Sequence, residues 1–192
     1  MKLKIFAIVV VITAILSSCL KEGSDNRTPV IGLLTLPVST TGDTLGCYIT
    51  DEAGIFRMDT ILVGDTIQFA IAATGFYNNI TAFYLTQSDS AAVIILPAVE
   101  KLDSVFSPRS DYKAGIFLLD GKGTDLIFPF KYVAVKPSKD IKIKFEVVSD
   151  ADFGNSGMMG ATNRAAMSLI TPIQQKEEPI EEPEVEVPIV ED

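Results

Sequence analysis

The sequence of this chain predicts an all-β fold, a two-sheet antiparallel sandwich. From Thr28 onward, apolar and polar residues alternate with a period of two, which is typical of strands with one buried face. About eight such segments recur at intervals of roughly 8 to 12 residues, as they do in sandwiches. No segment in this range has a long amphipathic helical stripe. A small barrel is the alternative arrangement.

Three segments show the alternation most clearly. Their apolar faces are Ile141, Ile143, Phe145 and Val147 in "IKIKFEVV", Ile67, Phe69 and Ile71 in "TIQFAIAA", and Leu45, Cys47 and Ile49 in "TLGCYIT". We expect each face to pack into the core. Cys47 is therefore predicted to be a small buried apolar residue and not a reactive thiol.

The remaining strands are predicted by less regular apolar segments. They cover residues 30–36, 80–86, 92–96, 112–119, 126–135 and 165–171, and most are separated by turns with Gly, Asp, Asn or Pro. Pro129 interrupts "LIFPFKYVAV", and proline cannot donate a hydrogen bond to a neighbouring strand. This run is therefore expected to hold a bulge, an edge strand or two strands that meet at a bend.

Composition argues against several classes of function. The 192 residues include 16 Lys and Arg against 25 Asp and Glu, a formal net charge of -9 that would repel nucleic-acid phosphates. Histidine is absent, and with it the commonest general base and metal ligand. Two cysteines without histidine cannot form a four-ligand zinc site. We therefore expect no enzymatic activity, no cofactor and no metal centre.

The first residues follow the order of a secretion signal. Lys2 and Lys4 precede an apolar run of twelve residues, from Ile5 to Leu16, that is broken only by Thr13. A membrane span needs about 20 apolar residues, so this run is too short to cross a bilayer. The alternative, a buried strand or helix of the fold, would place both lysines beside the core.

The run ends in Leu16-Ser17-Ser18-Cys19, which resembles the lipobox of bacterial lipoproteins at all four positions. The resemblance implies that residues 1–18 are a removable signal peptide and that Cys19 carries acyl chains, palmitate among them. Several chains attach a protein stably where one is marginal. Leu20 stands where an aspartate would typically retain a lipoprotein in the inner membrane. The resemblance therefore implies the outer membrane, on its periplasmic or its surface face, with residues 19–27 as anchor and tether.

Two stretches of the body read as a turn, strand, polar loop and strand, and as a closing strand that ends in Thr-Pro. They are "VGDTIQFAIAATGFYNNITAFYL" and "AMSLITPI". They resemble the immunoglobulin-like domains common in lipoproteins of gut-type Gram-negative bacteria. The resemblance covers residues 28–173 and implies an architecture and not an activity. The chain has no tryptophan, so it lacks the Cys…Trp…Cys core of antibody domains.

Residues 174–192 form a tail with one lysine, eight acids and three prolines. Such a segment buries too little apolar surface to order itself, so we expect a disordered C-terminus. The alternative is a docking strand, because Val185, Val187 and Ile189 alternate and could add to a sheet edge on a partner.

Two acidic clusters are candidates for chemistry. Asp150, Asp152 and Asn155 lie in the oxygen-rich segment "SDADFGNSG", which could bind calcium, although the spacing is not that of an EF-hand. A polar loop without metal is the simpler interpretation. Asp120 and Asp125 bracket "GKGT" and are expected to form a hairpin turn and not a carboxylate pair.

Phe76, Tyr77, Asn78 and Asn79 form a candidate ligand-binding loop between two predicted strands. Loops at one end of a sandwich often carry binding residues, and exposed rings could stack on sugars or on a protein. The alternative is that Phe76 or Tyr77 closes the end of the core.

A repeated Asp-Ser/Thr-aliphatic motif provides candidate modification sites. It resembles the acceptor motif of the general O-glycosylation system of the same bacteria, and the resemblance implies glycans on Thr44, Thr60, Thr66, Ser90 and Ser104. The alternative is a turn, in which Asp with Ser or Thr closes the turn and the aliphatic residue begins a strand.

These features predict a lipid-anchored cell-envelope protein that binds or scaffolds a protein or glycan partner. Two alternatives stay open. A structural subunit of an envelope or fimbria-like assembly would need an exposed edge strand and an exchangeable terminal strand. A glycoside hydrolase would need two carboxyl groups about 5 to 10 Å apart in a cleft.

Overall fold

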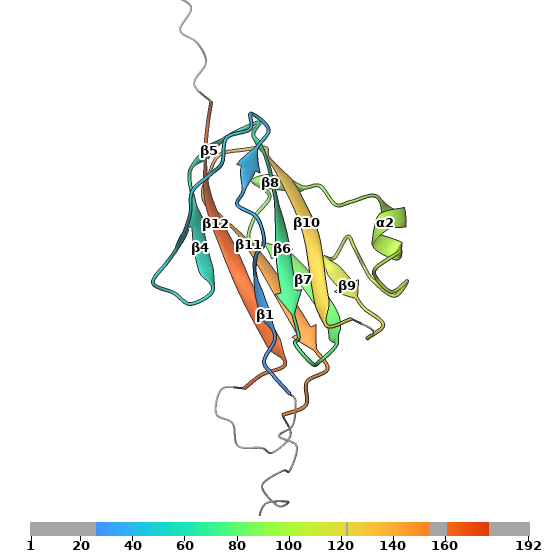
Figure 1. Ribbon diagram of the computed structural model, residues 1–192. Helices are drawn as coiled ribbons and strands as arrows, with labels where there is room; N and C mark the ends of the chain where they lie inside the picture. Colours follow the sequence, from blue (N-terminus) through green and yellow to red (C-terminus); the bar gives the residue numbers. More distant parts are fainter. Residues whose placement is uncertain (1–25, 122, 154–160, 177–192) are drawn as a thin grey trace, which may run out of the picture.

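The computed structural model describes residues 26–121, 123–153 and 161–176. They form two β-sheets that pack face to face, which confirms the predicted all-β, two-sheet sandwich (Figure 1). Sheet A consists of β1 (Val30–Leu33), β2 (Val38–Ser39), β6 (Thr66–Thr74), β8 (Ala92–Ile94) and β10 (Asp125–Ala134). Sheet B consists of β3 (Cys47–Ile49), β4 (Ile55–Met58), β5 (Ile61–Leu62), β7 (Ile80–Gln87), β9 (Ile116–Leu118), β11 (Ser138–Ser149) and β12 (Arg164–Gln174). The short helix α2 (Val99–Asp103) follows β8.

The strand order of each sheet differs from the order in the sequence. Sheet A has the order β1-β6-β10-β8, and β2 also pairs with β6. Sheet B has the order β3-β4-β12-β11-β7-β9, and β5 also pairs with β12. Most pairs are antiparallel, but β12 runs parallel to β4 and β5. The prediction of a purely antiparallel sandwich is wrong in this respect, because apolar alternation reveals the faces of strands and not their directions.

The core lies between the sheets and is rich in phenylalanine. The two strongest predicted faces are buried in it, namely Ile67, Phe69 and Ile71 of β6 and Ile141, Ile143, Phe145 and Val147 of β11. Phe145 of sheet B lies 4.9 Å from Phe130 of sheet A, between ring centroids, and Phe83 lies 4.9 Å from Phe128. The prediction fails at Ile49, which is 76% exposed because β3 is a three-residue edge strand.

One polar contact crosses this core. The hydroxyl groups of Tyr132 on β10 and Thr171 on β12 lie 3.2 Å apart, and both residues are buried. Burial raises the pKa of the Tyr132 phenol, so its hydroxyl stays neutral and can donate. Each hydroxyl satisfies the other, so the bond links the two sheets without leaving a buried polar atom unpaired.

Pro129 lies inside β10 without a bulge. β10 pairs with β6 in continuous register over residues 125–133. The carbonyl oxygen of Lys131 accepts a hydrogen bond from the Ile95 amide, on the side of β10 that faces β8. Pro129 lies two residues earlier, so its backbone nitrogen and carbonyl group face the same side. β8 itself pairs only with Tyr132–Ala134. None of the three predicted arrangements is observed, because β10 is an inner strand of sheet A and runs without a bulge. Proline is tolerated at position 129 because this part of β10 does not pair with β8.

Four short elements of two to five residues were not predicted, because none of them shows a readable periodicity. They are β2, β4, β5 and α2. The predicted strand 112–119 is a strand only at Ile116–Leu118. Gly115 before it has a φ of 71°, and a Cβ there would collide with the carbonyl oxygen of Leu85. This turn therefore requires glycine.

The described chain begins and ends at opposite ends of the sandwich (Figure 1). Thr28 accepts a hydrogen bond from Thr162, just before β12 begins. β12 then runs for eleven residues to Gln174, and such a strand is about 35 Å long. We call the end that carries Asn26 the tether end, after the tether predicted for residues 19–27. Within residues 26–121, 123–153 and 161–176, no helix is long and apolar enough to cross a membrane.

Candidate functional site

The outer face of sheet A, which points away from the core, exposes several large apolar side chains. Ile127 pairs with Ala72, and both alternate with buried neighbours, so both face outward. The larger exposed residues are Val30 (53%), Leu34 (52%), Leu36 (58%), Ile95 (42%) and Ile127 (65%). Single exposed apolar residues are ordinary, but a group of them on one sheet face indicates an interaction surface.

Small residues in the middle of this face leave hollows between the larger side chains. Gly32, Ala70 and Ala72 lie among the larger side chains, and two hollows of about 620 and 450 Å³ open here. The larger hollow contains one charged residue, Lys131, and the smaller contains one, Asp125. The face is therefore apolar with a single cation and a single anion in its hollows, and it has room for side chains of another molecule.

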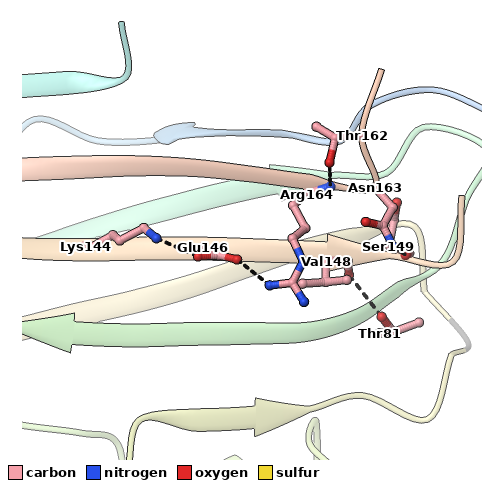
Figure 2. Close-up of polar contacts among 8 residues, drawn as sticks. All are labelled: Thr81, Lys144, Glu146, Val148, Ser149, Thr162, Asn163 and Arg164. Carbon is pink, nitrogen blue, oxygen red and sulfur yellow. Dashed lines mark hydrogen bonds and ion pairs between the residues drawn. The ribbon is translucent and has the colours of Figure 1, made fainter. Parts of the chain in front are cut away.

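The outer face of sheet B is polar. Glu146 accepts hydrogen bonds from Lys144 Nζ and Arg164 Nη1, each at 2.7 Å (Figure 2). Arg57 and Asp140 form a further ion pair at 2.7 Å. The two outer faces of the sandwich therefore differ, because charged groups suit sheet B to water while apolar groups suit sheet A to burial.

Side chains complete the backbone hydrogen bonds where β11 has a bulge between Val148 and Ser149 (Figure 2). The Thr81 hydroxyl donates to the Val148 carbonyl at 3.3 Å. The Asn163 side chain donates to the Ser149 carbonyl at 3.4 Å. These contacts hold the last residues of β11 beside the segment that leads into β12.

The ion pairs of Glu146 make a small part of the stability acid-sensitive. A hydrogen bond from Lys144 lowers the pKa of Glu146, partial burial opposes this, and Arg164 lowers the pKa further. A carboxylate with a lowered folded-state pKa stabilises the fold above its unfolded pKa, and this contribution is lost as the pH falls through the folded pKa. We expect Glu146→Gln to cost under about 1 kcal/mol at pH 7, and the difference from wild type to shrink as the pH falls below about 4 and through the lowered folded-state pKa of Glu146.

Urea unfolding of Glu146→Gln and wild type, at pH 7 and again at a pH well below 4, measures this difference. Glu52→Gln, at an exposed loop position, is the control and should not change the free energy of unfolding at either pH. A Glu146→Gln deficit of equal size at both pH values would contradict the ion-pair explanation.

The predicted loop at 76–79 joins β6 to β7 at the tether end. Phe76 is 40% exposed and Tyr77 is 67% exposed, so the alternative that one of them closes the core is wrong. The Cζ atom of Arg27 lies 5.8 Å from the centroid of the Phe76 ring and 5.5 Å from that of Tyr77. These are cation–π distances. The two rings therefore lie outside the core, and the Arg27 guanidinium group is close to both of them.

The two asparagines of this loop hold it in place. Asn78 Oδ1 accepts a hydrogen bond from the Arg27 amide at 3.0 Å. Asn79 donates to both carboxylate oxygens of Asp150, from its amide at 2.7 Å and its side chain at 2.9 Å. Asp150, which the sequence offered as a calcium ligand, thus binds the loop.

The structure describes two of the three candidate calcium ligands, Asp150 and Asp152. Asp152 lies beside Asn26, to which its amide donates at 3.3 Å, and Asn155 lies outside the described residues. Within the described parts of the chain, no group of three or more Cys, Asp or Glu side chains could hold a metal ion.

The candidate glycosylation residues lie at the surface with one exception. Thr44, Thr60, Ser90 and Ser104 are exposed, whereas Thr66 is half-buried at the start of β6. The preceding aspartates also form turn contacts: Asp65 accepts from the Leu62 amide at 2.9 Å, and Asp89 from the Ala91 amide at 2.6 Å. Exposure suits a glycan and the turn contacts suit the alternative, so both interpretations stay open.

The acids predicted to form a turn make separate contacts. Asp120 pairs with Arg109 at 3.8 Å. Asp125 accepts from Thr124 at 2.9 Å, and hydrogen bonds from Thr74 and Thr124 lower the pKa of Asp125. Besides the two hollows on sheet A, the described residues form two more, so that the four have volumes of about 450 to 820 Å³. Asp125 supplies the single carboxylate that lines any of these four. None of these four hollows therefore offers the pair of acids that a glycosidase needs.

The two cysteines have separate positions. Cys47 packs partly buried against the core, and burial raises the pKa of its thiol, with the Asp59 carboxylate raising it further. A thiol with a raised pKa stays protonated and unreactive at neutral pH, as expected for a core residue. Cys19 and the alternating residues of the tail, Val185, Val187 and Ile189, lie outside the described residues.

The outer face of sheet A was missed in the sequence, although a signal for it exists. β10 contains "LIFPF", which is apolar at every position, and β1 lies in the similar run "VIGLL". Continuous apolar runs indicate strands that are buried on both faces. What covers the second face cannot be read from a single sequence, so both runs were assigned to the core alone.

Comparison with known proteins adds little to these observations. No family model matches the sequence, and no curated protein matches it. Twelve chains of solved structures match. One is a family 123 glycoside hydrolase from Clostridium perfringens, described for glycolipid glycan hydrolysis, with 12% sequence identity and a TM-score of 0.33. The match covers 71% of this chain but only 28% of that chain. The described residues themselves define the class of protein, a β-sandwich with one exposed apolar sheet face.

Proposed function

We propose that this chain is a lipid-anchored protein of the bacterial cell envelope that binds a protein partner through the outer face of sheet A. It acts as a binding or scaffolding protein and not as an enzyme. The single observation that supports binding is the group of exposed apolar residues on that face, Val30, Leu34, Leu36, Ile95 and Ile127. Burying such surface contributes about 25 cal/mol per Å² before the costs of association are subtracted.

A protein partner fits this face better than a glycan. Sugar-binding surfaces use exposed aromatic rings, and the exposed large residues of this face are all aliphatic. The phenylalanines of β6 and β10, Phe69, Phe128 and Phe130, point into the core. The two hollows on this face could accommodate apolar side chains of a protein partner, as the packed cores of protein interfaces do.

Attachment to the membrane belongs to the same proposal. It is supported by the resemblance of Leu16-Ser17-Ser18-Cys19 to a lipobox and by the charged and apolar regions that precede it. In this proposal residues 1–18 are removed, Cys19 carries the acyl chains in the outer membrane, and the body is an immunoglobulin-like domain. The exposed residues Thr44, Thr60, Ser90 and Ser104 would then be available for O-glycosylation.

The alternative of a fimbria-like subunit has less support. Strand addition needs a long open edge, and the edge strands of the two sheets, β1, β8, β3 and β9, have three or four residues each. The last described strand, β12, lies between β4 and β11 and not at an edge. Exchanging it between subunits would require sheet B to open.

Site-specific photo-crosslinking in intact cells tests the proposal. A photo-crosslinking amino acid at Ile127 should capture another protein, whereas the same group at Thr86, exposed on the outer face of sheet B, should not. With that partner purified, Leu34→Asp should weaken binding at least about tenfold, and Thr86→Asp should leave it unchanged.

Two outcomes would count against the proposed face. Equal capture from Ile127 and Thr86, or no capture from either, would mean that the outer face of sheet A is not selectively used. Capture of a second copy of this chain would replace the separate partner with a homodimer.

A further inference from the structure

The tether end carries a preformed aromatic surface. Arg27, Phe76 and Tyr77 meet there, with both rings partly exposed and the guanidinium group at cation–π distance from each. Asn78 also donates to the Asn26 side chain at 2.9 Å. Together with the bonds of Asn79 to Asp150, these contacts attach the loop to the first described residues of the chain.

The backbone at Phe76 is strained to keep its ring at this position. Its φ is 60°, a left-handed value that bulky side chains seldom adopt and that costs about 1 to 2 kcal/mol. Asparagine or glycine would fit this φ with little cost. A strained aromatic residue that is not buried in the core suggests a use for the ring outside the fold.

The distance to the membrane follows from the proposed anchor. Asn26 follows Cys19 by only seven positions in the sequence, and a fully extended segment of this length spans at most about 25 Å. Asn26 lies beside the loop, bonded to Asn78 and to Asp152. If Cys19 is lipidated, the aromatic surface is held near the bilayer whatever path the tether takes.

We propose that Phe76 and Tyr77 insert into the lipid headgroup region and hold the sandwich upright on the membrane, with Arg27 placed to bond lipid phosphate. This inference rests on the lipid anchor of the proposed function. Aromatic rings with polar neighbours favour the membrane–water interface. The short tether makes insertion an intramolecular step, so a surface of two rings is sufficient.

The charges at the tether end favour insertion of the rings over electrostatic attraction. Arg27 is accompanied by Asp150 and Asp152, so the surface has no excess of positive charge. The contact should therefore form on zwitterionic phosphatidylethanolamine and should change little with salt, unlike the contact of a polybasic segment.

Tryptophan fluorescence in vesicles tests this inference directly, because the chain contains no tryptophan. The full chain, expressed with labelled palmitate and purified from membranes, is placed in phosphatidylethanolamine vesicles with brominated acyl chains. Tyr77→Trp is compared with Tyr48→Trp, a tyrosine of β3 with similar exposure, 62% against 67%. We expect bromine to quench the emission of Tyr77→Trp several-fold more strongly than that of Tyr48→Trp.

A second variant separates insertion from folding. Phe76→Asn suits the positive φ and should fold as well as wild type, yet in the Tyr77→Trp background it should reduce the quenching. Equal quenching of Tyr77→Trp and Tyr48→Trp in labelled protein would overturn the insertion and leave the anchor standing. Loss of partner capture in Phe76→Asn without such quenching would assign the rings to a protein site and also overturn it. Labelling that persists in Cys19→Ala would refute the anchor itself, and the insertion with it.

Discussion

Phe145→Ala should destabilise the protein by about 3 to 5 kcal/mol, which is the largest loss we expect from one side chain. Phe145 is fully buried on β11 and contacts two rings of the opposite sheet, at 4.9 Å from Phe130 and 6.1 Å from Phe69. Removing the ring leaves a cavity that neighbouring phenylalanines cannot fill without leaving their rotamers. Since domains are stable by only about 5 to 15 kcal/mol, much of this margin would be lost.

Urea unfolding followed by near-ultraviolet circular dichroism measures this effect. Lys142→Ala, an exposed position three residues earlier on the same strand, is the control and should change stability by less than about 0.5 kcal/mol. A loss below about 1 kcal/mol for Phe145→Ala would mean that the ring is not packed between the sheets.

Gly115→Ala should cost about 2 to 5 kcal/mol, the sum of a left-handed backbone in a non-glycine residue and of lost backbone hydrogen bonding. Gly115 has a φ of 71°, and its carbonyl accepts a hydrogen bond from the Leu85 amide at 2.9 Å. A Cβ at this position would meet the Leu85 carbonyl oxygen, so the turn would have to move away from β7. β9, which begins at the next residue, would lose part of its pairing.

Gly64→Ala is the matched control for this prediction. Gly64 also has a positive φ, 96°, but a Cβ there would meet no atom within 4 Å. This variant should show only the conformational cost of about 1 to 2 kcal/mol. Equal thermal destabilisation of the two variants would show that the contact with Leu85 contributes nothing.

The sequence predicted those strands in which apolar and polar residues alternate regularly. β6 and β11 were predicted because their inward residues, such as Phe69 and Phe145, recur at every second position. The loop at 76–79 was predicted as a site because it follows such a strand. Its side chains are positioned by Arg27 and Asp150, about 50 and 70 residues away in the chain, and no local pattern encodes such contacts.

Other features depend on which strands become neighbours, and a single sequence does not contain this information. The parallel pairing of Phe56 with Leu169 depends on tertiary structure, since antiparallel and parallel strands have the same apolar period. Likewise, Ile127 on β10 resembles a core residue in the sequence and is exposed because no described element covers the outer face of sheet A. The apolar face is therefore visible only once the topology is known.

The position of β12 has a consequence for when the protein can fold. In the described part of sheet B, β12 alone connects β3, β4 and β5 with β11, β7 and β9, and it is the last of the described strands. Its pairing of Leu169 with Phe56 closes a loop of 113 residues, and pairings this distant form slowly. Every strand of sheet A precedes residue 135, but sheet B stays divided until residue 174 is available. A chain of this topology would therefore stay incompletely folded until β12 has been synthesised.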